Sequence, residues 1–236
     1  MVAALRYKRV VIKLSGEAFA GANGFGIDPD VVHRIALELK ECMELGVECG
    51  IVVGGGNFLR ARSTHHIERT TADYMGMLGS VLNGMALQAS MEEQGAQTRV
   101  LSAIEIREVA EPYIRRRAIR HLEKGRAVIF AAGTGNPYFT TDTGAALRAA
   151  EIGAEALLKA TTVDGVYERD PKQDATAKKL DRLTYREALR PEIAVLDATA
   201  VSLSMDTKIP VIVFDLLTPG NIKRVLLGES IGSIIN

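Results

Sequence analysis

The stretch from residue 127 to residue 148 constrains the fold most, because it combines an apolar strand, a small-residue loop and a helix. The apolar run Ala127–Ala131 predicts a strand buried on both faces, which is typical of a parallel sheet. The loop 132–142 carries two glycines, and a helical pattern follows from Thr143. A strand that breaks into such a loop and then starts a helix exposes backbone N–H groups at the carboxyl edge of a sheet. Anions and nucleotides bind at such edges.

A plainer interpretation of this loop stays open at the level of the residues. In it, Gly133 and Gly135 supply turn geometry alone. Asp142 then does no more than cap the following helix. The rest of the chain has to decide between this interpretation and a ligand site.

The order strand, loop, helix recurs along the chain. Apolar strands are predicted at 9–14, 47–53, 98–102, 156–160, 210–214 and 232–235, and helices at 28–46, 70–93, 112–124, 143–153 and 197–206. Alternation of this kind predicts an α/β fold with a largely parallel sheet covered on both faces. Asp164-Gly165 between β-branched residues predicts a tight hairpin. The segment 21–26 carries three glycines and one aromatic residue, and it is predicted to lack regular structure.

Composition excludes several classes of function. Lys and Arg number 29, and so do Asp and Glu, so the formal net charge is zero; a general nucleic-acid binder would usually be basic. The sequence contains no run of eighteen apolar residues, so no membrane span is predicted. The first nine residues lack an apolar signal core, from which we expect a cytoplasmic protein. Cys42 and Cys49 fit a reducing compartment, and neither the cysteines nor the four histidines have metal-ligand spacing.

Lys13 stands near the end of the first apolar strand. A lysine there costs free energy unless an anion meets its ammonium group, so an anion site is predicted; a lysine snorkelling from an edge strand is the alternative. The second strand runs into Gly54, Gly55 and Gly56, where the absence of Cβ atoms lets the backbone approach a ligand. Arg60 follows about one helical turn later, where its guanidinium can meet phosphate. The G-x-x-x-x-G-K-[ST] phosphate loop does not occur.

The helix predicted at 70–93 has an unusually wide apolar surface. One stripe comprises Met75, Leu78, Leu82, Met85 and Ala89, and a second stripe beside it comprises Tyr74, Met77 and Val81. This surface exceeds what one sheet face needs, so part of it is predicted to be a subunit interface. Asp73 in the first turn either complements the helix dipole or contacts a ligand.

Three motifs together resemble the amino acid kinase family: residues 13–17, the triple glycine with Arg60, and residues 162–167 continuing through Asp170-Pro171. Within that family, residues 133–142 are similar to the bacterial-type branch that phosphorylates uridine monophosphate (UMP). The resemblance runs from Tyr7 to Ile235. It implies a three-layer αβα sandwich formed by one domain, 1–236, with a UMP-side lobe at about 1–155 and an ATP-side lobe at about 156–236.

The resemblance implies phosphoryl transfer from Mg-ATP to UMP. Lys13, Arg60 and Lys159 would supply positive charge, and Asp142 and Asp197 would orient the lysines or the waters of the metal; for Asp197 a helix cap is the competing interpretation. ATP-binding positions implied in this way are Lys13, Leu14, Ser15, Gly16, Gly56, Arg60, Thr161, Tyr167 and Asp170. UMP-binding positions are Gly55, Asp73, Thr134, Gly135, Asn136, Pro137, Tyr138, Phe139, Thr140 and Thr141.

The same resemblance implies regulation and assembly. It assigns Gly21, Ala22, Asn23, Gly24, Phe25 and Gly26 to activation by GTP, UTP to inhibition, and a homohexamer to the quaternary structure. No protein ligand for Mg²⁺ is assigned. Two other functions stay open: a non-catalytic nucleotide-binding or storage protein of the same fold, and an amino-acid kinase of the same family.

Overall fold

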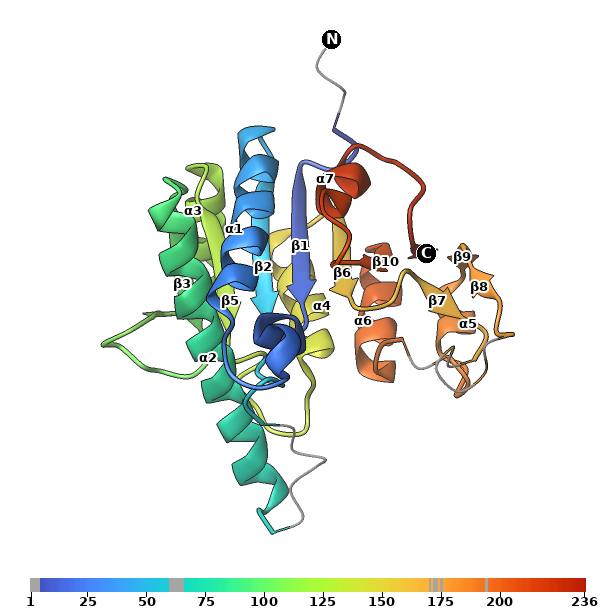
Figure 1. Ribbon diagram of the computed structural model, residues 1–236, viewed down its shortest axis with the longest axis horizontal. Helices are drawn as coiled ribbons and strands as arrows, with labels where there is room; N and C mark the ends of the chain where they lie inside the picture. Colours follow the sequence, from blue (N-terminus) through green and yellow to red (C-terminus); the bar gives the residue numbers. More distant parts are fainter. Residues whose placement is uncertain (1–4, 60–65, 170, 172–173, 175, 194) are drawn as a thin grey trace.

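A computed structural model describes residues 5–59, 66–169, 171, 174, 176–193 and 195–236. A mostly parallel sheet forms its middle layer, with helices on both faces (Figure 1). The strand order is β4-β3-β5-β2-β1-β6-β10-β11-β9. The strands are β1 (Arg9–Leu14), β2 (Glu48–Val53), β3 (Thr98–Ser102), β4 (Glu111–Pro112), β5 (Ala127–Ala131), β6 (Ala156–Thr161), β9 (Arg182–Leu183), β10 (Val211–Asp215) and β11 (Ser233–Ile235). The predicted αβα sandwich is confirmed.

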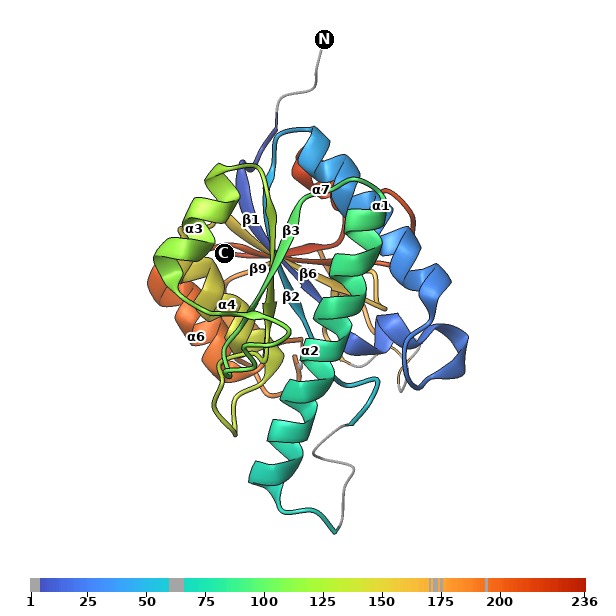
Figure 2. The same ribbon diagram turned by 90° about the vertical axis from the view of Figure 1, so that its left-hand side faces the viewer.

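Helices cover both faces of the sheet. One face carries the 3₁₀ helix η1 (Gly16–Asn23), α1 (Pro29–Glu44), α2 (Arg69–Glu93) and α7 (Asn221–Leu226), and the other carries α3 (Arg115–Glu123), α4 (Thr141–Ile152), α5 (Tyr185–Ala188) and α6 (Ala198–Thr207). Figure 2 shows the two helical layers on either side of the twisted sheet. No helix in the described part of the chain is long and apolar enough to cross a membrane.

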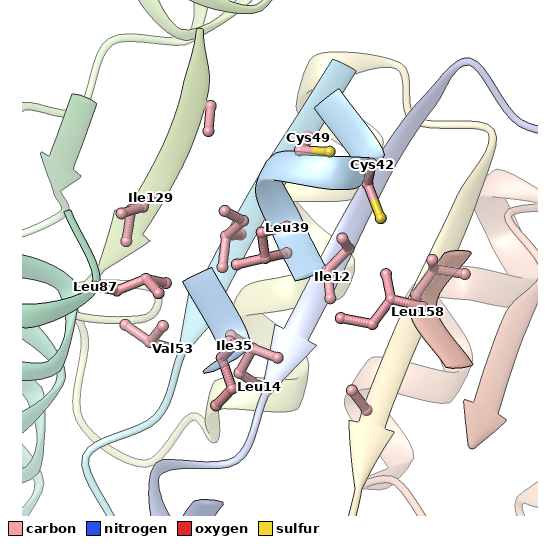
Figure 3. Packing of buried hydrophobic residues seen from close by; sticks show 14 of the residues in the cluster. Ile12, Leu14, Ile35, Leu39, Cys42, Cys49, Val53, Leu87, Ile129 and Leu158 are labelled. Atoms are coloured by element: carbon pink, nitrogen blue, oxygen red, sulfur yellow. The ribbon is translucent and has the colours of Figure 1, made fainter. Parts of the chain in front are cut away.

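The alternation of side chains along β1 separates the two halves of the core. Val10, Ile12 and Leu14 pack toward α1, whereas Val11 packs toward α4. Lys13 therefore lies on the α4 face. Figure 3 shows the α1 side, where residues of α1 pack on Ile12, Leu14 and their neighbours. Cys42 and Cys49 are buried free thiols in this layer, as predicted.

All strands from β3 to β10 in the sheet order run parallel, and only β11 runs antiparallel to its neighbour β10. The carboxyl ends of β5, β2, β1, β6 and β10 consequently meet at one edge. Because each of these ends continues into a loop, that edge gathers the segments that the sequence singles out: 15–16, 54–56, 132–141 and 161–165.

The predicted hairpin at Asp164-Gly165 is wrong. Residues 162–165 form no strand pair; β7 (Val166–Tyr167) pairs instead with β8 (Lys179–Leu180), far beyond it in the sequence. Other partners take the backbone groups that such a hairpin would use. Leu216 N–H donates to the Thr161 carbonyl (2.8 Å), and Val166 N–H donates to Ser233 Oγ (2.8 Å).

Two further expectations need correction. The helix predicted to begin at Pro112 begins at Arg115, because Glu111–Pro112 forms the edge strand β4, where a proline without an N–H group is tolerated. The segment 21–26 is not wholly irregular, because η1 reaches Asn23. Gly21 interrupts it with a non-helical φ of 55°.

Candidate active site

Lys13 and Lys159 lie side by side at the carboxyl edge of the sheet. β1 and β6 are parallel neighbours, and the register pairs Lys13 with Lys159. Paired residues of neighbouring strands project to the same face, so both side chains point toward α4. Because β1 lies in the middle of the sheet, with β2 and β6 on either side, the edge-strand interpretation of Lys13 is wrong.

The carboxylate of Asp142 lies close to the ammonium groups of both lysines. Its Oδ1 lies 3.2 Å from Lys13 Nζ and its Oδ2 lies 2.6 Å from Lys159 Nζ. Lys159 Nζ also donates to the Val195 carbonyl. The three side chains are mostly buried, at 11–15% exposure. The cluster of two lysines and one aspartate carries a formal charge of +1, which suits it to an anion that brings more negative charge than the carboxylate neutralises.

Burial and charge act in opposite directions on Asp142. Burial alone would raise the pKa of its carboxyl group, but Lys13 and Lys159 outweigh that effect and hold the pKa below its ordinary value. Burial lowers the pKa of Lys159, with Lys13 adding to that shift and Asp142 opposing it. Asp142 is therefore a carboxylate that holds two lysines in place, not a proton acceptor near neutral pH.

The helix-cap interpretation of Asp142 is wrong, because Thr140 caps α4. Thr140 Oγ1 accepts from the N–H groups of Asp142 (3.1 Å) and Thr143 (3.3 Å). For Asp197 the cap is real: its Oδ1 accepts from Ala200 N–H (3.0 Å) at the start of α6. Its carboxylate also accepts from Thr140 Oγ1 (2.5 Å) and Thr143 Oγ1 (2.8 Å). Asp197 therefore joins α6 to the amino end of α4.

The glycines of the two neighbouring loops pack against each other and against α2. A Cβ on Gly16 would lie 2.7 Å from Gly54 O and from Gly56 N. A Cβ on Gly55 would lie 2.1 Å from Gly76 O and 2.7 Å from Ser80 N in α2. These glycines are thus required for approach of backbone to backbone. Contacts within the protein therefore explain the glycines at positions 16 and 55 without the ligand approach expected for the glycine loop.

Asp73 contacts the loop 132–141. Its Oδ2 accepts from Tyr138 N–H (2.8 Å) and lies 3.7 Å from Arg69 Nε. The Arg69 guanidinium also lies over the Tyr138 ring, 4.7 Å from its centroid. Tyr138 and Phe139 are both exposed beside these groups. The structure therefore brings Asp73 together with the loop that the resemblance assigns to UMP.

The segment 21–26 also reaches the glycine loop. Asn57 Nδ2 donates to the Gly26 carbonyl (2.7 Å), and Gly26 N–H donates to the Asn57 carbonyl (3.1 Å). Phe25, which is exposed, meets the Phe58 ring edge-on at 6.1 Å. The segment is therefore in direct contact with the two residues that follow Gly56.

Of the positions that the resemblance assigns to ATP, Thr161 lies at the carboxyl end of β6 and Tyr167 lies in β7. Tyr167 Oη donates to Asp164 Oδ1 (2.7 Å), and Lys179 Nζ lies 3.2 Å from Asp164 Oδ2. Sequence reasoning missed Lys179, because its approach depends on the β7–β8 pairing. Asp164 and Lys179 border a cavity of about 320 Å³ that also meets Asp215, Asn221 and Arg224.

Some expectations remain open. Arg60 and Asp170 lie outside the described residues, so the structure does not place them. Within the part of the chain that is described, no group of three or more His, Cys, Asp or Glu side chains is arranged to hold a metal ion. Leu14 ends β1, and Ser15 and Gly16 follow it at the carboxyl edge of the sheet, where Gly16 packs against Gly54 and Gly56.

A parallel sheet with lysines, an aspartate and glycine loops at its carboxyl edge is the kind of edge at which α/β proteins bind anionic ligands such as nucleotides. The model of the amino acid kinase family matches residues 8–215, and the chain belongs to this family.

Three solved structures, two from bacteria and one from an archaeon, are similar to this chain. The UMP kinase from Bacillus anthracis is 40% identical, with a TM-score of 0.94 over 98% of this chain and 96% of that chain. The UMP kinase from Ureaplasma parvum is 34% identical, with a TM-score of 0.91 over 98% of this chain and 100% of that chain. The uridylate kinase from Archaeoglobus fulgidus is 29% identical, with a TM-score of 0.75 over 96% of this chain and 99% of that chain.

Proposed function

We propose that this protein transfers the γ-phosphoryl group of Mg-ATP to UMP, which yields ADP and UDP. The observation that carries the proposal is the cluster of Lys13, Lys159 and Asp142 at the carboxyl edge of the sheet. The chain that holds this cluster resembles a UMP kinase over nearly its whole length. The two alternatives, a storage protein and an amino-acid kinase, have no comparable support from the similar structures.

The chemistry needs positioning and charge more than covalent help from the protein. A phosphate oxygen of UMP attacks the γ-phosphorus of ATP, and the bond from that phosphorus to the bridging oxygen breaks, leaving ADP. The attacking oxygen is already ionised near neutral pH, because the second pKa of a phosphate monoester is about 6. No general base is therefore required, in agreement with the depressed pKa of Asp142.

Lys13 and Lys159 have the role of stabilising charge on the transferring group. Fixed cations in a site with little water oppose the developing negative charge without reorganising at the moment of reaction. Asp142 keeps both ammonium groups aimed at the edge, and Asp197 fixes the amino end of α4, on which Asp142 stands. Arg60 would add a further cation from the end of the glycine loop.

We assign Mg²⁺ to the substrate. Both oxygens of Asp142 already meet lysines, and the described residues supply no acidic cluster. Mg²⁺ commonly retains waters and binds phosphate oxygens with few protein ligands. A metal ion that binds to the phosphates of ATP and needs few protein ligands is consistent with this lack of an acidic cluster in the described part of the chain.

The two substrates would lie on opposite sides of the cluster. UMP is assigned to Gly55, Asp73 and residues 134–141, mostly within the lobe 1–155. ATP is assigned to residues 13–16, Gly56, Thr161, Tyr167 and the unplaced Arg60 and Asp170, with its base toward the lobe 156–236. The contact between Asp73 and Tyr138 N–H supports one continuous acceptor site.

Regulation and assembly form part of the same proposal. GTP would activate through residues 21–26, whose contacts with Asn57 and Phe58 give them access to the glycine loop. UTP would inhibit as an analogue of the product. A homohexamer would bury the exposed apolar residues of α2. The protein would act in the cytoplasm, in pyrimidine nucleotide synthesis.

A panel of acceptors tests the function. With Mg-ATP, we expect release of ADP with UMP, little with CMP, and none with aspartate or glutamate. Assays with and without GTP measure the proposed activation. Turnover only with an amino acid, or nucleotide binding without turnover, would select one of the alternatives and overturn the proposal.

A further inference from the structure

The backbone directly after β5 is strained. Ala132 has a φ of 62° and Gly133 a φ of 55°, so two consecutive residues adopt the left-handed region. For alanine this conformation is unfavourable, because its Cβ crowds the backbone. Such residues persist where the surrounding structure holds them in place, and they are frequent at functional sites. This turn leads directly into Thr134, where the acceptor loop 134–141 begins.

Ser80 of α2 holds the turn from one face of the sheet. It is buried, at 4% exposure, and its Oγ accepts from Ala132 N–H (3.0 Å). The same hydroxyl donates to the Val53 carbonyl (2.8 Å) at the end of β2. One side chain thus ties the strained turn to the strand that precedes Gly54.

Arg148 of α4 holds the turn from the opposite face. It is also only 4% exposed, and its Nη2 donates to the Gly133 carbonyl (3.2 Å). Its Nη1 donates to Glu151 Oε2 (2.6 Å), and its guanidinium stacks on Tyr113 at 3.7 Å from the ring centroid. Burying an arginine requires such compensation. The planar guanidinium makes these contacts together, which a lysine ammonium cannot do.

We propose that Ser80 and Arg148 are positioning residues for the acceptor nucleotide. They fix the turn Ala132–Gly133 from the two faces of the sheet and thereby set the path of the loop 134–141. Arg148 belongs to the same helix as Asp142, so α4 aligns the acceptor loop with the lysine cluster. The inference rests on the proposed function, because it assigns UMP to this loop.

The test compares Arg148→Lys and Ser80→Ala with the unmodified protein. Misplacement of a reacting group by about 1 Å costs on the order of 100-fold in rate, so we expect kcat/KM for UMP to fall roughly ten- to hundred-fold. The KM for ATP should stay near its original value in Arg148→Lys, because Arg148 contacts the turn and not the glycine loop; Ser80 also bonds to the Val53 carbonyl, so in Ser80→Ala the KM for UMP should rise more than the KM for ATP. UMP affinity by calorimetry should fall in parallel.

Thr98→Val is the matched control. Thr98 is fully buried in β3 beside α2, and its hydroxyl donates to Glu92 Oε1 (3.0 Å). It stands at the amino end of its strand, away from the proposed site. This variant should lower Tm, as Ser80→Ala should also do, without changing the ratio of the two KM values.

Ala132→Gly separates positioning from stability. Glycine removes the left-handed strain, so Tm should not fall, yet the freer turn should weaken UMP binding and speed hydrogen exchange of amides 134–138. Equal losses for UMP and ATP, or unchanged UMP affinity in all three variants, would overturn the inference. If the unmodified protein neither binds nor turns over UMP, the proposed function fails; unchanged hydrogen exchange in Arg148→Lys and Ser80→Ala would then overturn the positioning role separately.

Discussion

At the scale of single residues, the site is a balance of charges. Lys13 and Lys159 lie in register on β1 and β6, and the first turn of α4 brings Asp142 to both of them. One carboxylate, Asp142, meets both ammonium groups, and they hold its pKa below the ordinary value, so the three charges fix one another's positions. Such preorganisation is what electrostatic catalysis requires.

Removing Lys13 should therefore affect rate more than binding or folding. In Lys13→Met, we expect turnover to fall by about 10²–10³, because a preorganised charge opposite the transition state is lost. Asp142 keeps its partner Lys159, so the circular dichroism spectrum should stay unchanged. Steady-state kinetics with UMP and ATP measure the effect.

Lys8→Met is the control for this change. Lys8 is an exposed lysine directly before the other end of β1. Its loss should leave turnover unaltered. Should Lys13→Met turn over UMP at nearly the original rate, Lys13 is structural and the proposed mechanism is wrong.

Asp73 tests the acceptor side. Asp73→Asn should raise the KM for UMP far more than the KM for ATP, because the negative charge that pairs with Arg69 at the acceptor loop is lost. Asn retains a carbonyl that can accept from Tyr138 N–H, so the fold should persist. Similar changes in both KM values would make Asp73 a residue that only complements the helix dipole.

At the scale of elements, α2 has two different sides. Met77 and Val81, predicted as part of one apolar stripe with Tyr74, are buried against the sheet. Tyr74, Met75, Leu78, Leu82 and Met85 are exposed. An exposed apolar surface of this kind along one helix is typical of a contact between proteins.

A charge on this surface should prevent assembly. Leu82 is 49% exposed, so Leu82→Glu removes little from the core of the subunit but would bury a carboxylate in the proposed interface. Light scattering should report smaller particles than for the unmodified protein. Leu217→Glu, at a leucine of 52% exposure before α7, is the control and should leave the mass unchanged. A folded, active monomer of the unmodified chain would contradict the prediction.

At the scale of the whole molecule, the two buried thiols make stability depend on alkaline pH. Burial raises the pKa of Cys49 from 9.0 to about 12, and it raises the pKa of Cys42 as well. The unfolded chain therefore loses these protons at lower pH than the folded chain does. The stability that the neutral thiols contribute is complete below pH 9 and is lost between pH 9 and about 12.

Urea unfolding at pH 8 and pH 10 measures this dependence. We expect the free energy of unfolding to fall by roughly 1.4 kcal/mol per thiol for each pH unit above the unfolded pKa. Lys159 has the opposite effect on stability. Its pKa is lowered in the folded state, so the folded chain releases this proton at lower pH than the unfolded chain, and the free energy of unfolding rises with pH. In the double variant Cys42→Ala/Cys49→Ala the alkaline loss should shrink. An equal loss in that variant and the unmodified protein would assign it to other groups.

The fold was largely predictable because it follows from local patterns. Apolar runs buried on both faces and helices with caps, such as Asp28 before Pro29, fixed the order of elements and hence a parallel sheet. The errors fell where a distant segment competes for backbone groups. Ser233 and Leu216 take the partners that an Asp164-Gly165 hairpin would use, and β3 draws Pro112 out of the predicted helix.

The sequence by itself determined that lysines, glycines and aspartates follow successive strands, and that parallel strands bring such ends to one edge. It determined nothing about which charges touch. Only the tertiary structure decided that Lys13 and Lys159 share Asp142, and that Ser80 and Arg148 hold one turn from two faces. The physical reason is that register and helix packing set these contacts, and both depend on the whole core rather than on neighbours in the chain.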